Sequence, residues 1–303
     1  MNNILAVTGA SGKSGKVFMD LLADNSDKIN EMFEGGVRLI LHSNPAKSSG
    51  LERFNNVDQV FGALESRDFL EKSLAGVDTL VHIAGIHWSR EVVDAAKACN
   101  VRRLIMVHTT GIYSKYKEAG EEYRNIDAHV YEVCKENNIL LTILRPTMIY
   151  GCVADKNVVT FIKMVDKLPI MPVVGGARYG LQPVHYADLG QAYFDVLMNE
   201  SVTANHDYVL SGGAQIQLRE MLCEIAKNLG KNIHFFSVAF PIAYFMALAL
   251  YAVSFGKKDY REKVKRLVEP RVYDHDDATR DWGYSPRTFN EGIVDEVKEY
   301  MNR

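Results

Sequence analysis

One short segment constrains the fold of this chain more than any other. Residues 4–15 read ILAVTGASGKSG, an apolar run that is followed by a threonine and three glycines spaced three apart. An uninterrupted apolar run is typical of a strand buried in a parallel sheet. Gly9 allows a tight turn, Gly12 presents no Cβ to a pyrophosphate, and Gly15 lets the next helix pack close to the strand. The pattern predicts a dinucleotide bound at the N-terminus of that helix.

Apolar runs alternate with helical patterns along the first half of the chain. The predicted strands cover residues 4–8, 37–42, 57–61, 79–84, 104–109 and 140–145. The predicted helices cover residues 14–23, 68–74, 89–98 and 123–137. This alternation predicts an α/β fold of the Rossmann type, with a doubly wound parallel sheet covered by helices on both faces. Ligands of such sheets bind at the carboxyl ends of the strands.

After Gly151 this rhythm changes. We expect residues 1–150 to form the dinucleotide-binding core and residues 151–303 to form mainly a smaller C-terminal lobe that selects the substrate. A helix over 187–198 and a strand over 206–210 are expected to return to the core. The other predicted elements are helices at 157–167, 218–230 and 289–300 and short extended pieces near 171–175 and 181–185.

Composition argues against several other classes of protein. The 303 residues are 47% hydrophobic and 24% charged, which is ordinary for a soluble globular protein. A net charge of −3 gives no reason to expect nucleic acid as a partner. The four cysteines lie far apart without metal-ligand spacing, so we expect reduced thiols, no metal and a cytoplasmic protein. No signal peptide is expected in MNNILAVTG, which has no basic stretch or cleavage site.

Several segments, which occur in the same order, resemble the extended and atypical short-chain dehydrogenase/reductases (the NAD-dependent epimerase/dehydratase family). They are TGASGKSG, VDTLVHIAG, RLIMVHTTGIY, LLTILRPTMIYG, QPVHYADLGQAY, YVLSGG and RDWGYSPRTFNEGI. The last one is similar to the C-terminal signature of nucleotide-sugar epimerases and dehydratases. The resemblance covers almost the whole chain. The atypical branch includes NAD(P)H-dependent reductases of small aromatic, quinone or flavin compounds, redox-sensing regulators and assembly subunits.

The chemistry of this family rests on a Ser or Thr, a Tyr, and a Lys four residues after the Tyr. The resemblance places Thr109 and Tyr123 at the first two positions, and Asp127 then stands where the Lys is expected. A Tyr hydroxyl with a pKa near ~10 is a poor base unless a cation stabilises its anion, and a carboxylate has the opposite effect. The usual reaction therefore cannot be assumed. Literal Tyr-x-x-x-Lys spacings at Tyr113–Lys117 and Tyr131–Lys135 stay open as alternatives.

The predicted cofactor site spans the loops at the strand ends. Its residues are Gly9, Ser11, Gly12, Lys13, Gly15, His42, Ser43, Lys47, Ala63, Leu64, Ala84, Gly85, His108, Pro146 and Met148. NAD sites place an acid after the second strand to hold the ribose hydroxyls. No acid stands from Leu39 to Lys47, whereas His42, Ser43 and Lys47 can donate to a 2′-phosphate and Lys13 adds positive charge. The sequence therefore favours NADP and leaves NAD open.

The later half offers candidate substrate contacts and one long apolar segment. The resemblance gives Arg178, Gln182 and His185 as the contacts. Residues 235–255 hold no charge and match the roughly 20 residues that span a bilayer, but Pro241 interrupts them and six cations follow within 257–266. We expect a helix that lines an apolar pocket or a homodimer interface. Peripheral membrane contact through 235–266 is the next interpretation, and a true span is the last.

These observations predict an NAD(P)-dependent oxidoreductase of the atypical type. It would transfer hydride to or from a small, apolar carbonyl, quinone or related substrate. A nucleotide-sugar epimerase or dehydratase is the alternative, which the C-terminal signature favours and Asp127 opposes. A non-catalytic NAD(P)-sensing or assembly protein is the second alternative. We expect a cytoplasmic location, at the membrane surface if the apolar segment binds lipid.

Overall fold

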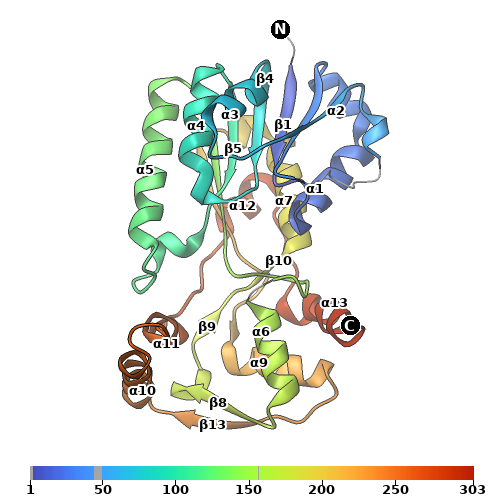
Figure 1. Cartoon of the computed structure of the whole chain (residues 1–303). Helices are drawn as coiled ribbons and strands as arrows, with labels where there is room; N and C mark the ends of the chain where they lie inside the picture. The colour runs from blue at the N-terminus through green and yellow to red at the C-terminus, as the bar shows by residue number, and fades with distance from the viewer. Residues whose placement is uncertain (1–2, 44–49, 156) are drawn as a thin grey trace.

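A seven-stranded parallel sheet forms the centre of the larger lobe in the computed structural model, which describes residues 3–43, 50–155 and 157–303 (Figure 1). The strand order is β3-β2-β1-β4-β5-β6-β11. The strands are β1 (Ile4–Thr8), β2 (Gly36–Leu41), β3 (Val57–Phe61), β4 (Val77–His82), β5 (Arg103–Val107), β6 (Leu140–Pro146) and β11 (His206–Leu210). This order is that of a doubly wound dinucleotide-binding sheet, and the predicted Rossmann-type fold is confirmed.

Helices cover both faces of this sheet, and β1 is therefore buried on both sides. Leu5 and Val7 belong to the apolar core on one face, and Ile4 and Ala6 to the core on the other, as the alternation of side chains along a strand requires. The helices of the first face are α1 (Lys13–Asp24) and α7 (Tyr186–Met198), and those of the second are α3 (Arg67–Leu74), α4 (Ser89–Ala98) and α5 (Gly120–Glu136). The short helices α2 (Ser26–Met32), α8 (Glu200–Thr203) and α12 (Asp276–Trp282) complete this lobe.

The smaller lobe lies beyond the carboxyl ends of the strands (Figure 1). It has its own apolar core. Its helices are α6 (Val158–Lys167), α9 (Leu218–Asn228), α10 (Phe240–Val253), α11 (Arg261–Leu267) and α13 (Phe289–Met301). Its short strands are β7 (Ile149–Tyr150), β8 (Ile170–Val174), β9 (Gly180–Leu181), β10 (Val184–His185), β12 (Ile216–Gln217) and β13 (His234–Val238). The exact boundary between core and substrate lobe stays a prediction.

The long apolar segment is not a single helix, and that expectation is wrong. Its first residues form β13, which pairs in parallel with β8, and the rest forms α10 with Pro241 in the first turn. Pro cannot donate to the ladder of a strand but is well suited to the start of a helix, so it marks the change of structure. Within the described residues, no helix is both long enough and apolar enough to cross a membrane.

Candidate functional site

The glycine loop between β1 and α1 has the geometry of an anion cradle. Gly9 has φ of +76°, and a Cβ there would lie 2.9 Å from the backbone nitrogen of Ala84. A Cβ on Gly15 would lie 2.1 Å from the Gly9 carbonyl oxygen, so no side chain fits. Gly12 occupies the N-cap of α1 and has no side chain with which to accept from the first N–H groups. These groups and the helix dipole therefore face the loop and favour a bound phosphate.

A buried histidine, His82, links the ends of β1 and β4 next to this loop. Thr8 Oγ1 lies 2.7 Å from His82 Nδ1, and His82 Nε2 lies 3.1 Å from the Gly85 carbonyl oxygen. Burial, together with the nearby His108, lowers the pKa of His82 to about 4, so the ring is neutral at pH 7. Sequence analysis missed this residue. The signal was a polar side chain at the end of an otherwise apolar strand.

A cavity of about 400 Å³, here called the His42 cavity, lies where the glycine loop meets the ends of β2 and β4. It is lined by Gly9, Ser11, Ile40, Leu41, His42, Leu64, Glu65, Ala84 and Trp88. Five of these nine, namely Gly9, Ser11, His42, Leu64 and Ala84, are predicted cofactor residues. Glu65 and Trp88 were not among the predicted residues. At the loop after β3 the prediction named only Ala63 and Leu64, the two residues before Glu65.

Several other predicted cofactor residues are sequence neighbours of the residues that line this cavity. Lys13 opens α1 and is exposed, Ser43 is exposed next to His42, and Ala63 precedes Leu64. Gly85 follows Ala84 with φ of +103°. Lys47 lies outside the described residues.

A second cavity of about 160 Å³, here called the Thr109 cavity, lies between the two lobes. It is lined by Thr109, Thr110, Gly111, Ser114, Lys117, Thr147, Met148, Asn157, Leu181, Gln182, Arg266, Arg271 and Tyr273. The predicted residues Thr109, Met148 and Gln182 meet here. Pro146 does not line this cavity, but its carbonyl oxygen accepts a hydrogen bond from Oγ1 of the lining residue Thr110 at 3.1 Å.

Three cations, Lys117, Arg266 and Arg271, line the Thr109 cavity, and their meeting in one site was not predicted from the sequence. The Nε atoms of Arg266 and Arg271 are buried without a hydrogen-bond partner among the described residues. Burial and the charge of Arg266 lower the pKa of Lys117, and burial likewise lowers the pKa of Arg271. Two acids compensate part of this charge: Glu262 Oε1 lies 3.5 Å from Arg266 Nη1, and Glu269, which accepts from Ser114 Oγ at 2.7 Å, acts on Arg271. An anion in this cavity would therefore be stabilised by charges that are incompletely compensated.

Asp127, at the expected lysine position, belongs to a buried charge network. Its Oδ1 accepts from His108 Nδ1 at 2.6 Å, and its Oδ2 lies 2.7 Å from Arg145 Nη1. Arg145 also contacts Asp207 at 2.7 Å, while His108 Nε2 lies 3.0 Å from Ser89 Oγ. Burial alone would raise the pKa of Asp127, but the His108 hydrogen bond and the Arg145 charge lower it by more. Both carboxylate oxygens and both ring nitrogens of His108 are thus engaged in holding α5 and β6 against β5.

Tyr123 lies on α5 with its ring buried. Its hydroxyl is 3.5 Å from His87 Nε2, and Lys117 Nζ lies 5.3 Å from the centre of its ring. Burial raises the pKa of Tyr123, so it keeps its proton at pH 7. Lys117 comes from the loop after the short helix η3 (Thr110–Tyr113), not from α5. A cation therefore does lie beside Tyr123, but it enters from a different segment than the family pattern expects.

The alternative Tyr–Lys spacings have different surroundings. Tyr113 is exposed, and its ring is tilted against that of Tyr273 with the ring centres 5.6 Å apart; it does not line the Thr109 cavity although Lys117 does. Tyr131 donates a hydrogen bond to Asp207 and lines a separate cavity of about 440 Å³ together with Lys135. The second pair is therefore remote from Thr109.

Of the three predicted substrate contacts, only Gln182 lines the Thr109 cavity. Gln182 lines the Thr109 cavity, but its Nε2 donates to the Gly212 carbonyl oxygen at 2.9 Å and its Oε1 accepts from the Tyr273 N–H at 3.2 Å. His185 is buried at the N-cap of α7, where Nδ1 accepts from the Ala187 N–H at 3.2 Å, and burial lowers its pKa to about 4. Neither His185 nor the exposed Arg178 is among the residues that line the cavity.

The sheet order, the glycine cradle and the two cavities at the carboxyl ends of the strands define a dinucleotide-binding α/β protein. The chain belongs to the NAD(P)H-binding family, which it matches over residues 9–161. The predicted use of a nicotinamide dinucleotide is thereby confirmed.

Similar proteins include both epimerases and reductases. UDP-glucose 4-epimerase of Vibrio cholerae is 21% identical over 241 residues, which are 73% of this chain and 69% of that protein. The structure of UDP-glucose 4-epimerase from Thermotoga maritima has a TM-score of 0.70 and 16% identity, with 99% of both chains covered. That of an NADPH-dependent quinone oxidoreductase from Escherichia coli has a TM-score of 0.67 and 18% identity, with 98% of this chain and 100% of the other covered. The resemblance to the extended short-chain dehydrogenase/reductases is confirmed.

Proposed function

We propose that this protein is an NADP(H)-preferring reductase whose substrate carries a carbonyl carbon and, next to it, an anionic group. The bound nicotinamide would supply the hydride. The observation that carries the proposal is the cluster of Lys117, Arg266 and Arg271 in the Thr109 cavity. The polar and cationic lining does not support the small apolar substrate expected from the sequence.

The residues of the larger lobe fit the cofactor. The His42 cavity would take the adenosine end, and the glycine loop at the N-terminus of α1 would take the pyrophosphate. The preference for the phosphorylated form rests on His42 and Lys13, which can donate to a phosphate, and on the lack of an acid directly after β2. Titration of bound NADPH and NADH by fluorescence tests it. A His42→Ala variant should weaken NADPH about tenfold more than NADH, since a hydrogen bond to a charged group contributes ~1.5–3 kcal/mol.

Electrostatics supports an anionic substrate. Desolvated cations without full compensation are costly, and a carboxylate or phosphate would accept from Lys117 and from the guanidinium groups of Arg266 and Arg271, which line the cavity. Arg266 is carried by α11, so the anion would also hold the smaller lobe against the larger one. The substrate carbonyl would then lie next to Thr109, at the end of β5.

The proton chemistry favours reduction over oxidation. Thr109 Oγ1 accepts from the Gly111 N–H at 3.0 Å, which leaves its own hydrogen to donate to a carbonyl oxygen. Lys117 lines the same cavity, and its lowered pKa makes it the better proton donor of the nearby groups. Tyr123, with its raised pKa, keeps its proton, and we assign it to positioning Lys117 through the face of its ring.

The test is NADPH oxidation with a matched panel of substrates. Anionic carbonyl compounds such as 2-oxo acids should be reduced, and neutral quinones and aldehydes should not. Lys117→Met and Arg271→Met should each raise KM at least tenfold, because each removes one charge-assisted contact. Lys115→Met, which alters an exposed lysine of the same loop, is the control. Equal turnover of neutral substrates, or no oxidation across the panel, would overturn the proposal.

A nucleotide-sugar epimerase or dehydratase is the second candidate. The cation cluster favours it, because a sugar nucleotide carries a diphosphate, and the similarity to UDP-glucose 4-epimerase points the same way. Such a reaction begins by removing a proton from a sugar hydroxyl, which the raised pKa of Tyr123 opposes. Interconversion of sugar nucleotides without net consumption of NADPH would establish this candidate over the first.

A further inference from the structure

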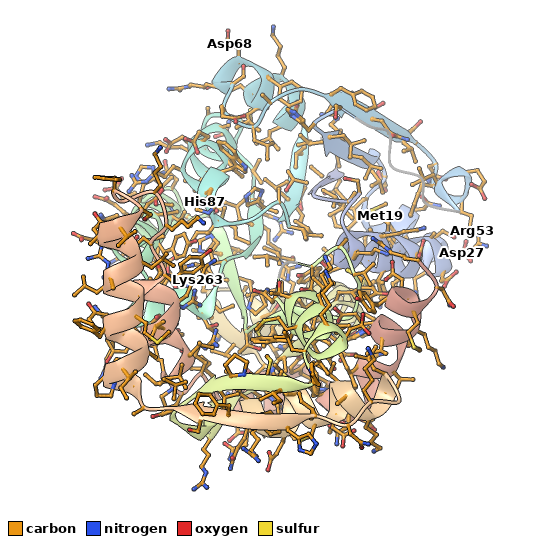
Figure 2. All side chains as sticks on the ribbon, turned by 60° about the horizontal axis from the view of Figure 1, so that its bottom comes forward. Met19, Asp27, Arg53, Asp68, His87 and Lys263 are labelled. Atoms are coloured by element: carbon orange, nitrogen blue, oxygen red, sulfur yellow. The ribbon has the colours of Figure 1, made fainter. Side chains whose placement is uncertain are left out.

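Helix α10 carries an apolar stripe that no described part of the chain covers. Residues 242, 245, 246, 249 and 253 follow the i, i+3, i+4, i+7, i+11 spacing of one helix face, and all are apolar and exposed. Phe245 is 69% exposed, Met246 61% and Val253 77%. Figures 1 and 2 both show α10 at the outer edge of the smaller lobe. A soluble helix normally turns polar residues to this side, so the stripe needs a partner.

The opposite face of α10 holds the helix on the protein. Ala247 is buried, and Tyr244 and Tyr251 are partly buried against α11. Lys265 Nζ lies 5.3 Å from the ring centre of Tyr244, and the Arg261 guanidinium lies 4.1 Å from that of Tyr251. The inner face of α10 thus packs against the protein, and the apolar stripe lies on the outer face of the same helix. Neither cavity of the proposed reaction includes a residue of α10.

Charge next to the stripe identifies the kind of partner. Phe255, 93% exposed, continues the apolar surface past the end of α10, and the exposed Lys257 and Lys258 follow at once. Residues 257–266 hold six cations and two acids, an excess of four positive charges in a chain whose net charge is −3. An apolar helix face beside a basic cluster is the pattern of an element that lies in the interface of an anionic membrane.

We propose that α10 docks this protein on an anionic lipid bilayer. The stripe from Ile242 to Val253, together with Phe255, enters the boundary between headgroups and acyl chains, while Lys257 and Lys258 contact acidic headgroups. At 14 residues α10 lies in the surface and does not cross it. The Thr109 cavity, which includes Arg266 of the adjoining α11, then lies close to the membrane surface.

Sedimentation of the full chain with vesicles tests the apolar part. The probes are phosphatidylcholine vesicles with and without phosphatidylglycerol, and we expect binding to the anionic ones. The double variant Phe245→Ser/Met246→Ser should lower the partition coefficient more than tenfold, because two large apolar side chains no longer enter the bilayer. Val202→Ser/Met301→Ser, which replaces two exposed apolar residues elsewhere, should bind like the wild type. Equal losses in both double variants would overturn the proposal.

A second pair of variants tests the charges. Lys257→Gln/Lys258→Gln should lower binding to anionic vesicles about tenfold and make it less sensitive to salt, and Lys72→Gln/Lys97→Gln should not. The absence of sedimentation at low salt would overturn the proposal. So would a wild-type dimer in analytical ultracentrifugation that the Phe245→Ser/Met246→Ser variant converts to monomer, since a second copy would then cover the stripe. None of these measurements depends on the proposed reaction.

Discussion

Replacing Asp127 by Asn tests whether position 127 holds a structural charge instead of a catalytic one. The Asp127 side chain is 8% exposed and that of Arg145 is 3% exposed. Removing one partner of a buried ion pair typically costs ~3–5 kcal/mol. Arg145 keeps its contact with Asp207, and the amide oxygen of Asn still accepts one hydrogen bond. We therefore expect a loss of about 2–4 kcal/mol in the free energy of unfolding.

Thermal unfolding by circular dichroism measures this loss. An unfolding entropy of ~2.1 cal/mol/K per residue converts 2–4 kcal/mol into a fall of about 3–6 °C in the melting temperature of this chain. The matched control is Asp94→Asn, which removes the carboxylate from a His–Asp pair of similar length, 2.8 Å, at a site that is 46% exposed. That change should cost less than ~1 kcal/mol, or about 1.5 °C.

The dependence on pH sharpens the test. The pKa of Asp127 is lowered in the folded state, because the His108 hydrogen bond and the Arg145 charge outweigh the effect of burial. A carboxyl group of this kind contributes stability that is present above its unfolded pKa of ~3.9 and is lost as pH falls through the folded value. The gap between wild type and Asp127→Asn should hold from pH 7 to pH 5 and close in stronger acid. Equal melting temperatures for Asp127→Asn and Asp94→Asn at pH 7 would refute the reasoning.

Three further predictions concern single groups. Gly15→Val should abolish NADPH binding in a fluorescence titration, because its Cβ would lie 2.1 Å from the Gly9 carbonyl oxygen. The pKa of His82 is about 4 in the folded protein against 6.5 ordinarily, so His82 binds its proton more readily in the unfolded chain. The free energy of unfolding should therefore fall by up to ~3 kcal/mol as pH drops from 6.5 to 4, and the fall should be smaller in His82→Asn. Burial raises the pKa of Glu296 to about 9, and Glu296→Gln should change the melting temperature at pH 7 by less than about 2 °C, because the amide oxygen still accepts from the Gly151 N–H.

Strands buried on both faces could be predicted from the sequence with good accuracy. The bounds of β1, β3, α4 and β11 agree with the prediction. A continuous apolar run marks β1 and a clear 3.6-residue period marks α4, whereas β3 and β11 have polar residues and end in short apolar runs. Helices α2 and α12 were missed because seven residues are too few to establish a period. The segment 235–255 was misassigned for the opposite reason. It is apolar throughout, so it has no period that could separate β13 from α10.

The His42 cavity could be predicted because its residues follow strands that are adjacent in the sheet. Once the strand order is known, the ends of β1, β2 and β4 must meet at one edge. The Thr109 cavity could not be predicted in the same way. Lys117 belongs to a loop of the larger lobe and Arg266 to a helix almost 150 residues later, and no sequence motif includes both positions. Only the packing of the two lobes brings these charges together.

The resemblance places Asp127 at the lysine position, and the contacts of Asp127 and the position of Lys117 are consistent with that placement. A lysine on α5 at 127 would place its charge beside Arg145, which contacts this position at 2.7 Å, so the buried network and the family's lysine exclude each other. The cation beside Tyr123 is instead Lys117, which reaches the ring from the preceding loop. Asp127→Lys should therefore lower stability by more than Asp127→Asn and leave activity no higher than in the wild type, whereas Lys117→Met should lower activity with little loss of stability. An Asp127→Lys variant that is stable and more active would mean that a cation at position 127 serves the reaction better than Lys117 does.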